Sequence, residues 1–337
     1  MDTMDQVMNM EGAPLSRRYY GGQAGRKIGV TFDGCDWLLK YPAATRRLAG
    51  SVPSYTTAPL SEYLGSHIYA ALGIPVHDTR LAVRDGRIVC ACRDFVGDGE
   101  RLVEFAQLMN YMDEDDLPSS SSPDTTHGQR IVYLADARAA LYRVPELAGT
   151  EGAAERFWDM FVTDAFIRNI DRNNTNWGLL DHGRERAFTL APVYDNGNSL
   201  GNKKTSTAIG KALDDPGRIR QDALDVRSCY HDDRGHPIAP FKYMRSGDDD
   251  CVQALDRFMQ RWDPARLDDI LAAVPARAYG LSVMDEQQRD YHARVLRARY
   301  EQAFTPIWRD TATHITPFDM AAPWTITPDG ATHGPNH

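Results

Sequence analysis

The stretch IRNIDRNNTNWGLL, residues 167–180, decides the fold because it joins the end of a helix, a polar loop and the start of a strand. The apolar periodicity of a helix ends near Arg168, and apolar residues resume after the loop. Within the loop, Asp171 and Asn176 stand in the spacing D-x-x-x-x-N. Phosphoryl transfer requires a carboxylate that orients or deprotonates the attacking hydroxyl, and an oxygen ligand that binds Mg²⁺. Taken alone, this segment is equally compatible with an ordinary Asn/Asp-rich turn.

A second acidic side chain follows one hairpin later, in LAPVYDNGN, residues 190–198. A predicted turn at Asp181-His182-Gly183 returns the chain, so Asp195 should lie beside Asn176. Kinases place a Mg²⁺-binding aspartate at the end of such a strand. Mg²⁺ prefers oxygen ligands and keeps several waters, so Asn176, Asp195 and the phosphates of ATP suffice to hold it. A plain tight turn after Asp195 is the alternative, and both motifs in this order make it the weaker one.

The first third of the chain supplies parts that would hold a nucleotide. The glycine loop GGQAG, residues 21–25, precedes a strand, and the backbone N–H groups of Gly22, Gln23 and Gly25 could face phosphates. A hairpin turn is the alternative interpretation of this loop. Lys40 ends the next strand, in WLLKYP, and its place suits a lysine that binds the α- and β-phosphates. A lysine in an apolar strand can also simply extend its amine to solvent.

Two further parts complete the order. Glu62 lies on the predicted helix 60–72 and is the candidate partner that holds Lys40 in place, although a first-turn glutamate also suits the helix dipole. Arg93-Asp94-Phe95 stands where strands give way to helices, so Asp94 and Phe95 would contact adenine through their backbone. No single part is specific, but the ordered set is typical of a kinase.

These parts predict an α+β, two-lobed protein-kinase-like fold, with a small strand-rich N-lobe and a larger helical C-lobe. We expect a flexible N-terminus at 1–16, the N-lobe at 17–98, the C-lobe at 99–305 and an extended tail at 306–337. The predicted strands are 26–33, 35–41, 78–84, 87–92, 177–180 and 187–194. The predicted helices are 60–72, 100–112, 129–143, 152–168, 247–262, 265–273 and 285–304.

Composition excludes several classes of protein. The chain has 337 residues, of which 42% are hydrophobic and 25% charged, with a formal net charge of −9. Lys and Arg are scattered along the sequence. This argues against nucleic acid as a partner, because proteins that bind nucleic acid usually cluster Lys and Arg in a basic surface stripe that neutralises the phosphates. The five cysteines lack the spacing of zinc ligands and fit buried thiols. No apolar run suits a secretion signal or a membrane span, so we expect a cytoplasmic protein without stable membrane insertion.

At this point the sequence resembles the HipA-like kinases, and more closely their compact CtkA-type branch. The resemblance runs from about Tyr20 to Asn202, through YYGGQAGRKIGV, WLLKYP, PLSEYLGSHIYAALGI, CRDF, IDRNNTN and PVYDNGNSLGNK. It implies a serine/threonine protein kinase fold that binds ATP and Mg²⁺. It also implies that Asp171 is the catalytic base, that Asn176 and Asp195 bind metal, and that Lys40 binds phosphate.

Two departures from the toxin-type members of that family concern partners and regulation. Those members carry an additional N-terminal subdomain, for which Lys40 leaves no room here, so an antitoxin partner is doubtful. They also carry an autophosphorylated serine before the glycine loop. The corresponding position of this chain is near Arg18, so we do not expect that regulatory serine here.

Other kinds of function stay open. DRNNTN followed by YDNG is also similar to the corresponding pair in type II phosphatidylinositol 4-kinases, which makes a lipid or a small molecule the alternative phosphate acceptor. An inactive kinase fold that serves as a binding module is the alternative of another class, although Lys40, Asp171, Asn176 and Asp195 are all present.

The favoured acceptor is a serine or threonine hydroxyl of a protein, with autophosphorylation included. The segment NGNSLGNKKTSTAIGKALDD, residues 196–215, follows Asp195 in the place of a kinase activation segment. A phosphate there could pair with nearby lysines and order the segment, whereas a solvated, unmodified loop is the alternative. The hydroxyls and lysines concerned are Ser199, Thr205, Ser206 and Thr207, and Lys203 and Lys204.

Overall fold

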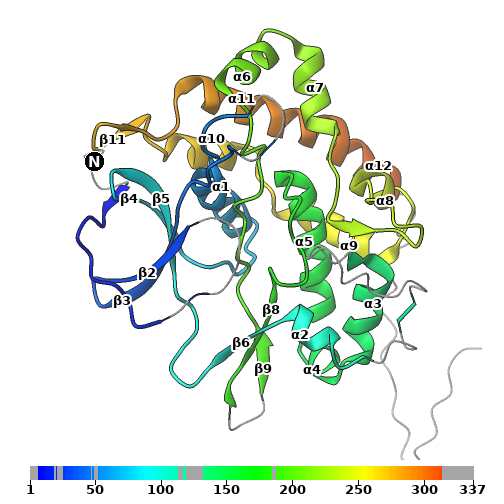
Figure 1. Ribbon diagram of the computed structural model, residues 1–337. Coiled ribbons are helices and arrows are strands. Elements are labelled where there is room, and N and C mark those ends of the chain that lie inside the picture. The colour runs from blue at the N-terminus through cyan, green and yellow to red at the C-terminus, as the bar shows by residue number, and fades with distance from the viewer. Residues whose placement is uncertain are drawn as a thin grey trace, which may run out of the picture.

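The computed structural model describes residues 7–18, 20, 26–46, 48, 52–112, 117–118, 132–183 and 187–312. Figure 1 shows a strand-rich part, blue to cyan in the first third of the chain, beside a larger helical part, and this is the predicted α+β, two-lobed arrangement. Each of the predicted helices and strands has a counterpart in the structure, although several bounds differ and some elements were not predicted.

A five-stranded sheet forms the N-lobe, in the order β1-β4-β5-β3-β2. Its two hairpins turn at Asp33-Gly34 and Asp85-Gly86, and all four residues have positive φ, as the tight Asp-Gly turn requires. The strands are β1 (Val7–Asn9), β2 (Lys27–Phe32), β3 (Cys35–Lys40), β4 (Thr79–Arg84) and β5 (Arg87–Arg93). Both hairpins were predicted from these turns.

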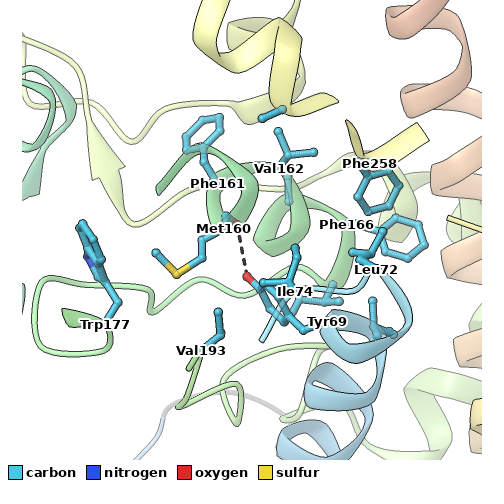
Figure 2. Close-up of a cluster of buried hydrophobic side chains, with 14 of the residues drawn as sticks. Tyr69, Leu72, Ile74, Met160, Phe161, Val162, Phe166, Trp177, Val193 and Phe258 are labelled. Atoms are coloured by element: carbon cyan, nitrogen blue, oxygen red, sulfur yellow. Dashed lines mark hydrogen bonds between the residues drawn. The ribbon is translucent and has the colours of Figure 1, made fainter. Parts of the chain in front are cut away.

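Helix α1 (Ala58–Ala71) joins the sheet to the C-lobe. Its apolar residues Leu60, Leu64 and Ile68 are buried, and the helix packs against β4, β5 and α5. Figure 2 shows Tyr69 of α1 and the residues after the helix against α5, where the Tyr69 hydroxyl lies 3.4 Å from the Met160 carbonyl oxygen. One continuous apolar core therefore spans both lobes and fixes α1 relative to the loop that follows α5.

The C-lobe is built around the buried helix α5. Its helices are α2 (Phe105–Met109), α3 (Leu134–Arg143), α4 (Pro145–Ala148), α5 (Ala153–Ile167), α6 (Ser206–Leu213), α7 (Pro216–Leu224), α8 (Pro240–Met244), α9 (Asp249–Arg261), α10 (Ala265–Ala272), α11 (Glu286–Arg299), a π-helix (Tyr300–Phe304) and α12 (Thr305–Ala312). Its strands are β6 (Arg101–Glu104), β7 (Val132–Tyr133), β8 (Gly178–Asp181), β9 (Phe188–Leu190), β10 (Tyr230–His231), β11 (Arg277–Ala278) and β12 (Leu281–Ser282).

The predicted helix at 100–112 is wrong in its first turn. Residues Arg101–Glu104 form β6, which pairs with β8 in a three-stranded sheet, and only Phe105–Met109 are helical. The predicted strand at 187–194 is likewise shorter, because β9 ends at Leu190. In both cases the pairing partner along the chain, and not the local pattern, sets the length of the element.

Both expected ends of the chain are more structured than predicted. Instead of a flexible terminus at 1–16, β1 pairs in parallel with β4, and Met10 is fully buried. Instead of an extended tail from 306, α12 continues to Ala312, and Ile307 is fully buried. The remaining residues of both predicted segments, 1–6 and 313–337, lie outside the described residues.

Helix α6 occupies residues 206–213 of the predicted activation segment 196–215, and α7 begins directly after this segment, at Pro216. Thr205 caps α6, because its hydroxyl accepts the Ala208 N–H, and Asp215 caps α7. Within the described part of the chain, no helix is long and apolar enough to cross a membrane.

Candidate active site

The loop that carries Asp171 begins at an unusual backbone position. Helix α5 ends at Ile167, and Arg168 follows with φ 56°, a left-handed conformation that turns the chain away from the helix axis. The buried Asn169 accepts a hydrogen bond from the Asp171 N–H at 3.1 Å and donates one to Asp164 of α5 at 3.2 Å. The backbone of Asp171 is therefore tied directly to the end of the helix.

The Asp171 carboxylate is held from two sides. Its Oδ1 accepts from the Asn173 amide at 3.0 Å, and its Oδ2 accepts from the Asn198 amide at 3.2 Å. Both partners are neutral amides, and no cation pairs with this carboxylate among the residues that the structure describes. Such a half-buried, oriented carboxylate can receive or align a hydroxyl proton.

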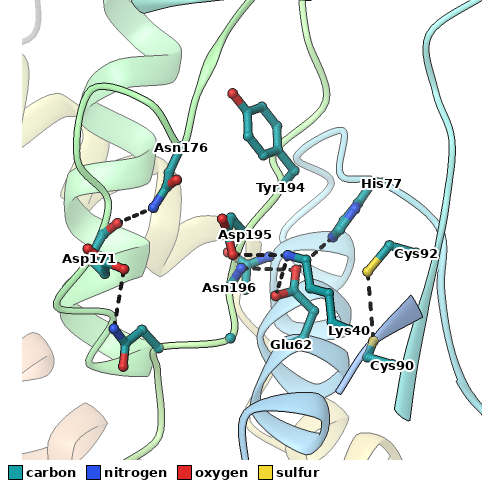
Figure 3. Close-up of polar contacts among 12 residues, drawn as sticks. Lys40, Glu62, His77, Cys90, Cys92, Asp171, Asn176, Tyr194, Asp195 and Asn196 are labelled. Atoms are coloured by element: carbon teal, nitrogen blue, oxygen red, sulfur yellow. Dashed lines mark hydrogen bonds and ion pairs between the residues drawn. The ribbon is translucent and has the colours of Figure 1, made fainter. Parts of the chain in front are cut away.

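Asn176 faces the same space with its amide oxygen. Its Nδ2 donates to the carbonyl oxygen of Asp171, which orients the amide, while its Oδ1 receives a weak contact from the Thr175 hydroxyl at 3.4 Å. Figure 3 shows Asp171 and Asn176 on one side of the site, with Asp195 beside Lys40 and Glu62 on the other.

Asp195 also has a left-handed backbone conformation, with φ 60°. Non-glycine residues in this region cost about 1–3 kcal/mol and cluster at functional sites. One oxygen of Asp195, Oδ1, lies 2.9 Å from the Lys40 amine, and its other oxygen receives no hydrogen bond from the residues that the structure describes. Together with the amide oxygen of Asn176, this is a set of hard oxygen donors that suits Mg²⁺.

Lys40 lies between two carboxylates. Its Nζ is 2.8 Å from Glu62 Oε2 and 2.9 Å from Asp195 Oδ1, so residues from β3, α1 and the loop after β9 meet at one amine. Burial alone would lower the pKa of Lys40, but Asp195 and Glu62 outweigh it and hold that pKa well above its ordinary value. Likewise, burial opposes ionisation of Asp195, yet Lys40 keeps the pKa of Asp195 below its ordinary value. The triad is therefore ionised at neutral pH.

Glu62 is completely buried and has partners on both oxygens. Its Oε1 accepts the Asn196 N–H at 3.0 Å and lies 3.0 Å from Nε2 of His77. The Cys92 thiol is close to the same group, so Glu62, His77 and Cys92 have the composition of a metal site. The Lys40 amine already occupies this pocket, and its positive charge would repel a cation there.

Arg172, which follows Asp171, ties the two loops together and was missed in the sequence. Its guanidinium pairs with the Asp164 carboxylate at 2.9 Å and donates to the carbonyl oxygens of Asn176 and Tyr194 and to the side-chain oxygen of Asn196. Because Tyr194 precedes Asp195, one arginine fixes the backbone next to both predicted metal ligands. Arg172 is only 2% exposed, and removing one partner of such a buried pair typically costs about 3–5 kcal/mol.

Lys27 is a second lysine that faces the site. It is paired in register with Lys40 on β2 and β3, and residues opposite each other on antiparallel strands project to the same face. Burial raises the pKa of Glu104, and the charge of Lys27 only partly offsets this rise; Lys27 also adds to the larger effect of Lys40 in lowering the pKa of Asp195. The predicted turn at Asp33-Gly34 already implied this register, so the signal was present in the sequence.

The other residues predicted to bind the nucleotide are Asp94, Phe95 and those of the glycine loop. The Asp94 carboxylate accepts from Arg18, Tyr20 and the Val96 N–H, and the Asp94 N–H donates to the Asp36 carbonyl oxygen at 2.9 Å. The Asp94 carbonyl oxygen and the Phe95 backbone are therefore the groups of this segment that could contact the adenine base of a nucleotide. The Phe95 ring lies 5.7 Å from the Tyr194 ring, measured between centroids. Gly22, Gln23 and Gly25 lie outside the described residues.

The sequence of this chain matches a known protein family and a known kinase. Residues 20–233 match the HipA-like C-terminal domain. The serine/threonine-protein kinase CtkA of Helicobacter pylori strain J99 is 26% identical over 312 residues, which is 90% of this chain and 91% of that protein.

A solved structure has the same fold. The crystal structure of the Helicobacter pylori proinflammatory kinase CtkA matches with a TM-score of 0.79 at 24% identity, covering 92% of this chain and 99% of that one. HipA in the Shewanella oneidensis complex of HipA, HipB and operator DNA matches with a TM-score of only 0.44 at 10% identity, which is too low to support a conclusion.

Proposed function

Because the chain belongs to the HipA-like C-terminal domain family and is a serine/threonine protein kinase by its likeness to CtkA, we propose that it transfers the γ-phosphate of ATP, with Mg²⁺, to serine or threonine hydroxyls of a protein. The observation that carries the proposal is the Lys40 amine between Glu62 and Asp195, at 2.8 and 2.9 Å. A lysine, a helix glutamate and a metal-binding aspartate assembled in this way are the parts that phosphoryl transfer by protein kinases requires.

Each residue then has a distinct role. Lys40, helped by Lys27, would hold the phosphates, while Asn176 and Asp195 would hold a Mg²⁺ ion that neutralises charge developing on them. Asp171 would orient the acceptor hydroxyl and take its proton. The backbone of Asp94 and Phe95 remains our candidate for contact with adenine.

The Lys40–Glu62 contact leads to a prediction about coupling. Lys40→Met should lower kcat/KM for ATP about tenfold by removing a charge-assisted contact to phosphate, and Glu62→Ala should do so to a lesser degree. Since Glu62 acts by holding Lys40, the double variant should be little worse than Lys40→Met, with a coupling energy of at least about 0.5 kcal/mol. Steady-state kinetics on the four proteins measure it, and additive effects would show that the two residues do not cooperate.

The acceptor hydroxyls in the segment after Asp195 differ in access. Ser199 is completely buried, and its hydroxyl donates to the Asn196 carbonyl oxygen at 2.7 Å, so it is a poor acceptor without local opening. Thr205 is occupied as the cap of α6, whereas Ser206 and Thr207 are exposed. If the enzyme labels itself in this segment, Ser206 and Thr207 are the preferred sites.

Labelled ATP and Mg²⁺ test the acceptor directly. We expect label on the chain itself or on a generic basic protein, and mass spectrometry would locate it on serine or threonine. Asp171→Asn, prepared in parallel, controls for contaminating kinases and should carry almost no label. Label confined to phosphoinositide extracts or to a soluble metabolite would overturn the protein-kinase assignment, while the kinase fold would stand.

A further inference from the structure

His77 lies behind the Lys40–Glu62 pair, in the segment between α1 and β4. Its ring is buried, and Nε2 lies 3.0 Å from Glu62 Oε1 (Figure 3). Because an ionised carboxylate only accepts hydrogen bonds, Nε2 carries a proton and donates it. The backbone N–H of His77 also donates to the carbonyl oxygen of Val193 at 3.0 Å, two residues before Asp195. The backbone of His77 is thus held by the segment that leads to Asp195.

The partners of Glu62 divide between its two oxygens. Oε2 faces Lys40, whereas Oε1 receives His77 and the Asn196 N–H. The terminal torsion of a glutamate has a broad energy minimum, so a carboxylate with a partner on one oxygen can rotate. Donors on the second oxygen remove that freedom and direct Oε2 at the Lys40 amine.

Ser66 closes the arrangement on the side of α1. Its hydroxyl lies 3.3 Å from Nε2 of His77 and accepts the Asn196 side-chain amide at 3.0 Å. Asn196 in turn accepts from Arg172 of the catalytic loop. His77 therefore stands in a continuous buried polar network that joins the lysine of the N-lobe to the loop that carries Asp171.

The charges around Glu62 also support a role for His77. Burial would raise the pKa of Glu62, but Lys40 and His77 together hold it well below its ordinary value. Lys40 also pairs with Asp195, so the hydrogen bond from His77 supplies part of what a fully buried Glu62 needs to stay ionised.

We propose that His77 is a positioning residue, which fixes the Glu62 carboxylate and through it presents the Lys40 amine to the phosphates of the nucleotide. The inference rests on the proposed function, since it assumes that Lys40 binds phosphate. His77 itself touches neither ATP nor the acceptor. Its removal should therefore affect ligands that carry phosphates and leave the binding of the base unchanged.

The test compares two ligands on two variants of the full chain. His77→Leu fills the space without a donor, and it should weaken binding of a non-hydrolysable ATP analogue with Mg²⁺ about tenfold, the usual effect of losing a group that orients a ligating side chain. Adenosine lacks phosphates and should bind as it does to the wild type. His77→Gln places an amide N–H near the position of Nε2 and should restore most of the affinity. In a Lys40→Met background, His77→Leu should have no further effect.

His292→Leu is the matched control. His292 is a buried histidine on α11, and burial lowers its pKa to about 4, so it is neutral like the leucine that replaces it. This variant should bind both ligands normally, and thermal unfolding would report any loss of stability in each protein. Equal weakening of the ATP analogue and adenosine in His77→Leu would reveal a structural role and overturn the proposal, as would wild-type affinity for the analogue. A wild-type protein that binds no ATP analogue would instead overturn the proposed function.

Discussion

Asp171→Asn is expected to lower phosphoryl transfer roughly 10²–10⁴-fold, the range for losing a general base, while ATP affinity stays unchanged. The substitution is nearly isosteric and removes only the charge that, in the proposed function, receives or orients the hydroxyl proton. Asn173 and Asn198 donate to both oxygens of Asp171, so an asparagine keeps at least one of these contacts. Single-turnover kinetics with labelled ATP measure the rate, and calorimetry measures the affinity.

Asp181→Asn is the matched control for that experiment. Asp181 ends β8, the strand that follows the Asp171 loop, and its carboxylate pairs with Arg101 at 2.9 Å. Exposed pairs of this kind contribute about 0–1 kcal/mol, so the control should keep wild-type activity. A loss of ATP affinity in Asp171→Asn as large as its loss of rate would make Asp171 a binding residue and not a base.

The sequence predicts the residues of this site better than it predicts the residues that hold them in place. The Asp-Gly turns fix the hairpin register, so the position of Lys40 at the end of its strand follows from local rules, as does that of Lys27 opposite it. The helix with Glu62 follows from apolar residues at helical spacing. These parts lie close in sequence, which is why patterns reveal them.

Arg172 and His77 could not be identified in this way. Arg172 connects Asp164, eight residues before it, to Asn196, twenty-four residues after it, and His77 contacts Glu62 across a turn of the chain. Their roles arise from burial and from tertiary contacts, and an arginine or histidine in a polar stretch carries no periodic signal. Only the folded chain shows that both are enclosed.

Other features that were not predicted do have a local signal in the sequence. Glu104 and Gln107 have the spacing of a helix start, and the Glu104 N–H does donate to the Gln107 side chain, so the strand–helix change inside 100–112 had a local marker. Asp215 followed by Pro216 marks the start of α7 in the same way. Pro306 indicated an end of helical structure, yet it falls in the first turn of α12, where proline is tolerated. By contrast, β1 is three residues long and pairs with residues that lie 74 positions further along the chain, which no local pattern predicts.

Asp195→Ala is expected to reduce turnover at least about 10²-fold, the scale for losing one electrostatic stabiliser of the transition state. The variant loses the proposed ligand of Mg²⁺ and one of the two carboxylates that hold the Lys40 amine. The Mg²⁺ concentration needed for half-maximal turnover should therefore rise, and Mg²⁺-dependent binding of ATP should weaken. Kinetics over a Mg²⁺ titration, with calorimetry of ATP binding, measure both effects.

The backbone of Asp195 requires a second variant, because φ 60° strains an alanine more than an aspartate. Asp195→Asn tolerates this conformation and keeps the shape of the side chain, so its activity isolates the loss of charge from any loss of fold. It should be impaired nearly as strongly as Asp195→Ala, with an unchanged unfolding temperature. Asp290→Ala removes an exposed carboxylate paired with Arg294 on α11 and serves as the neutral control. Should Asp195→Asn retain wild-type turnover and Mg²⁺ dependence, the assignment of Asp195 as a metal ligand is wrong, and the carboxylate serves only to hold Lys40.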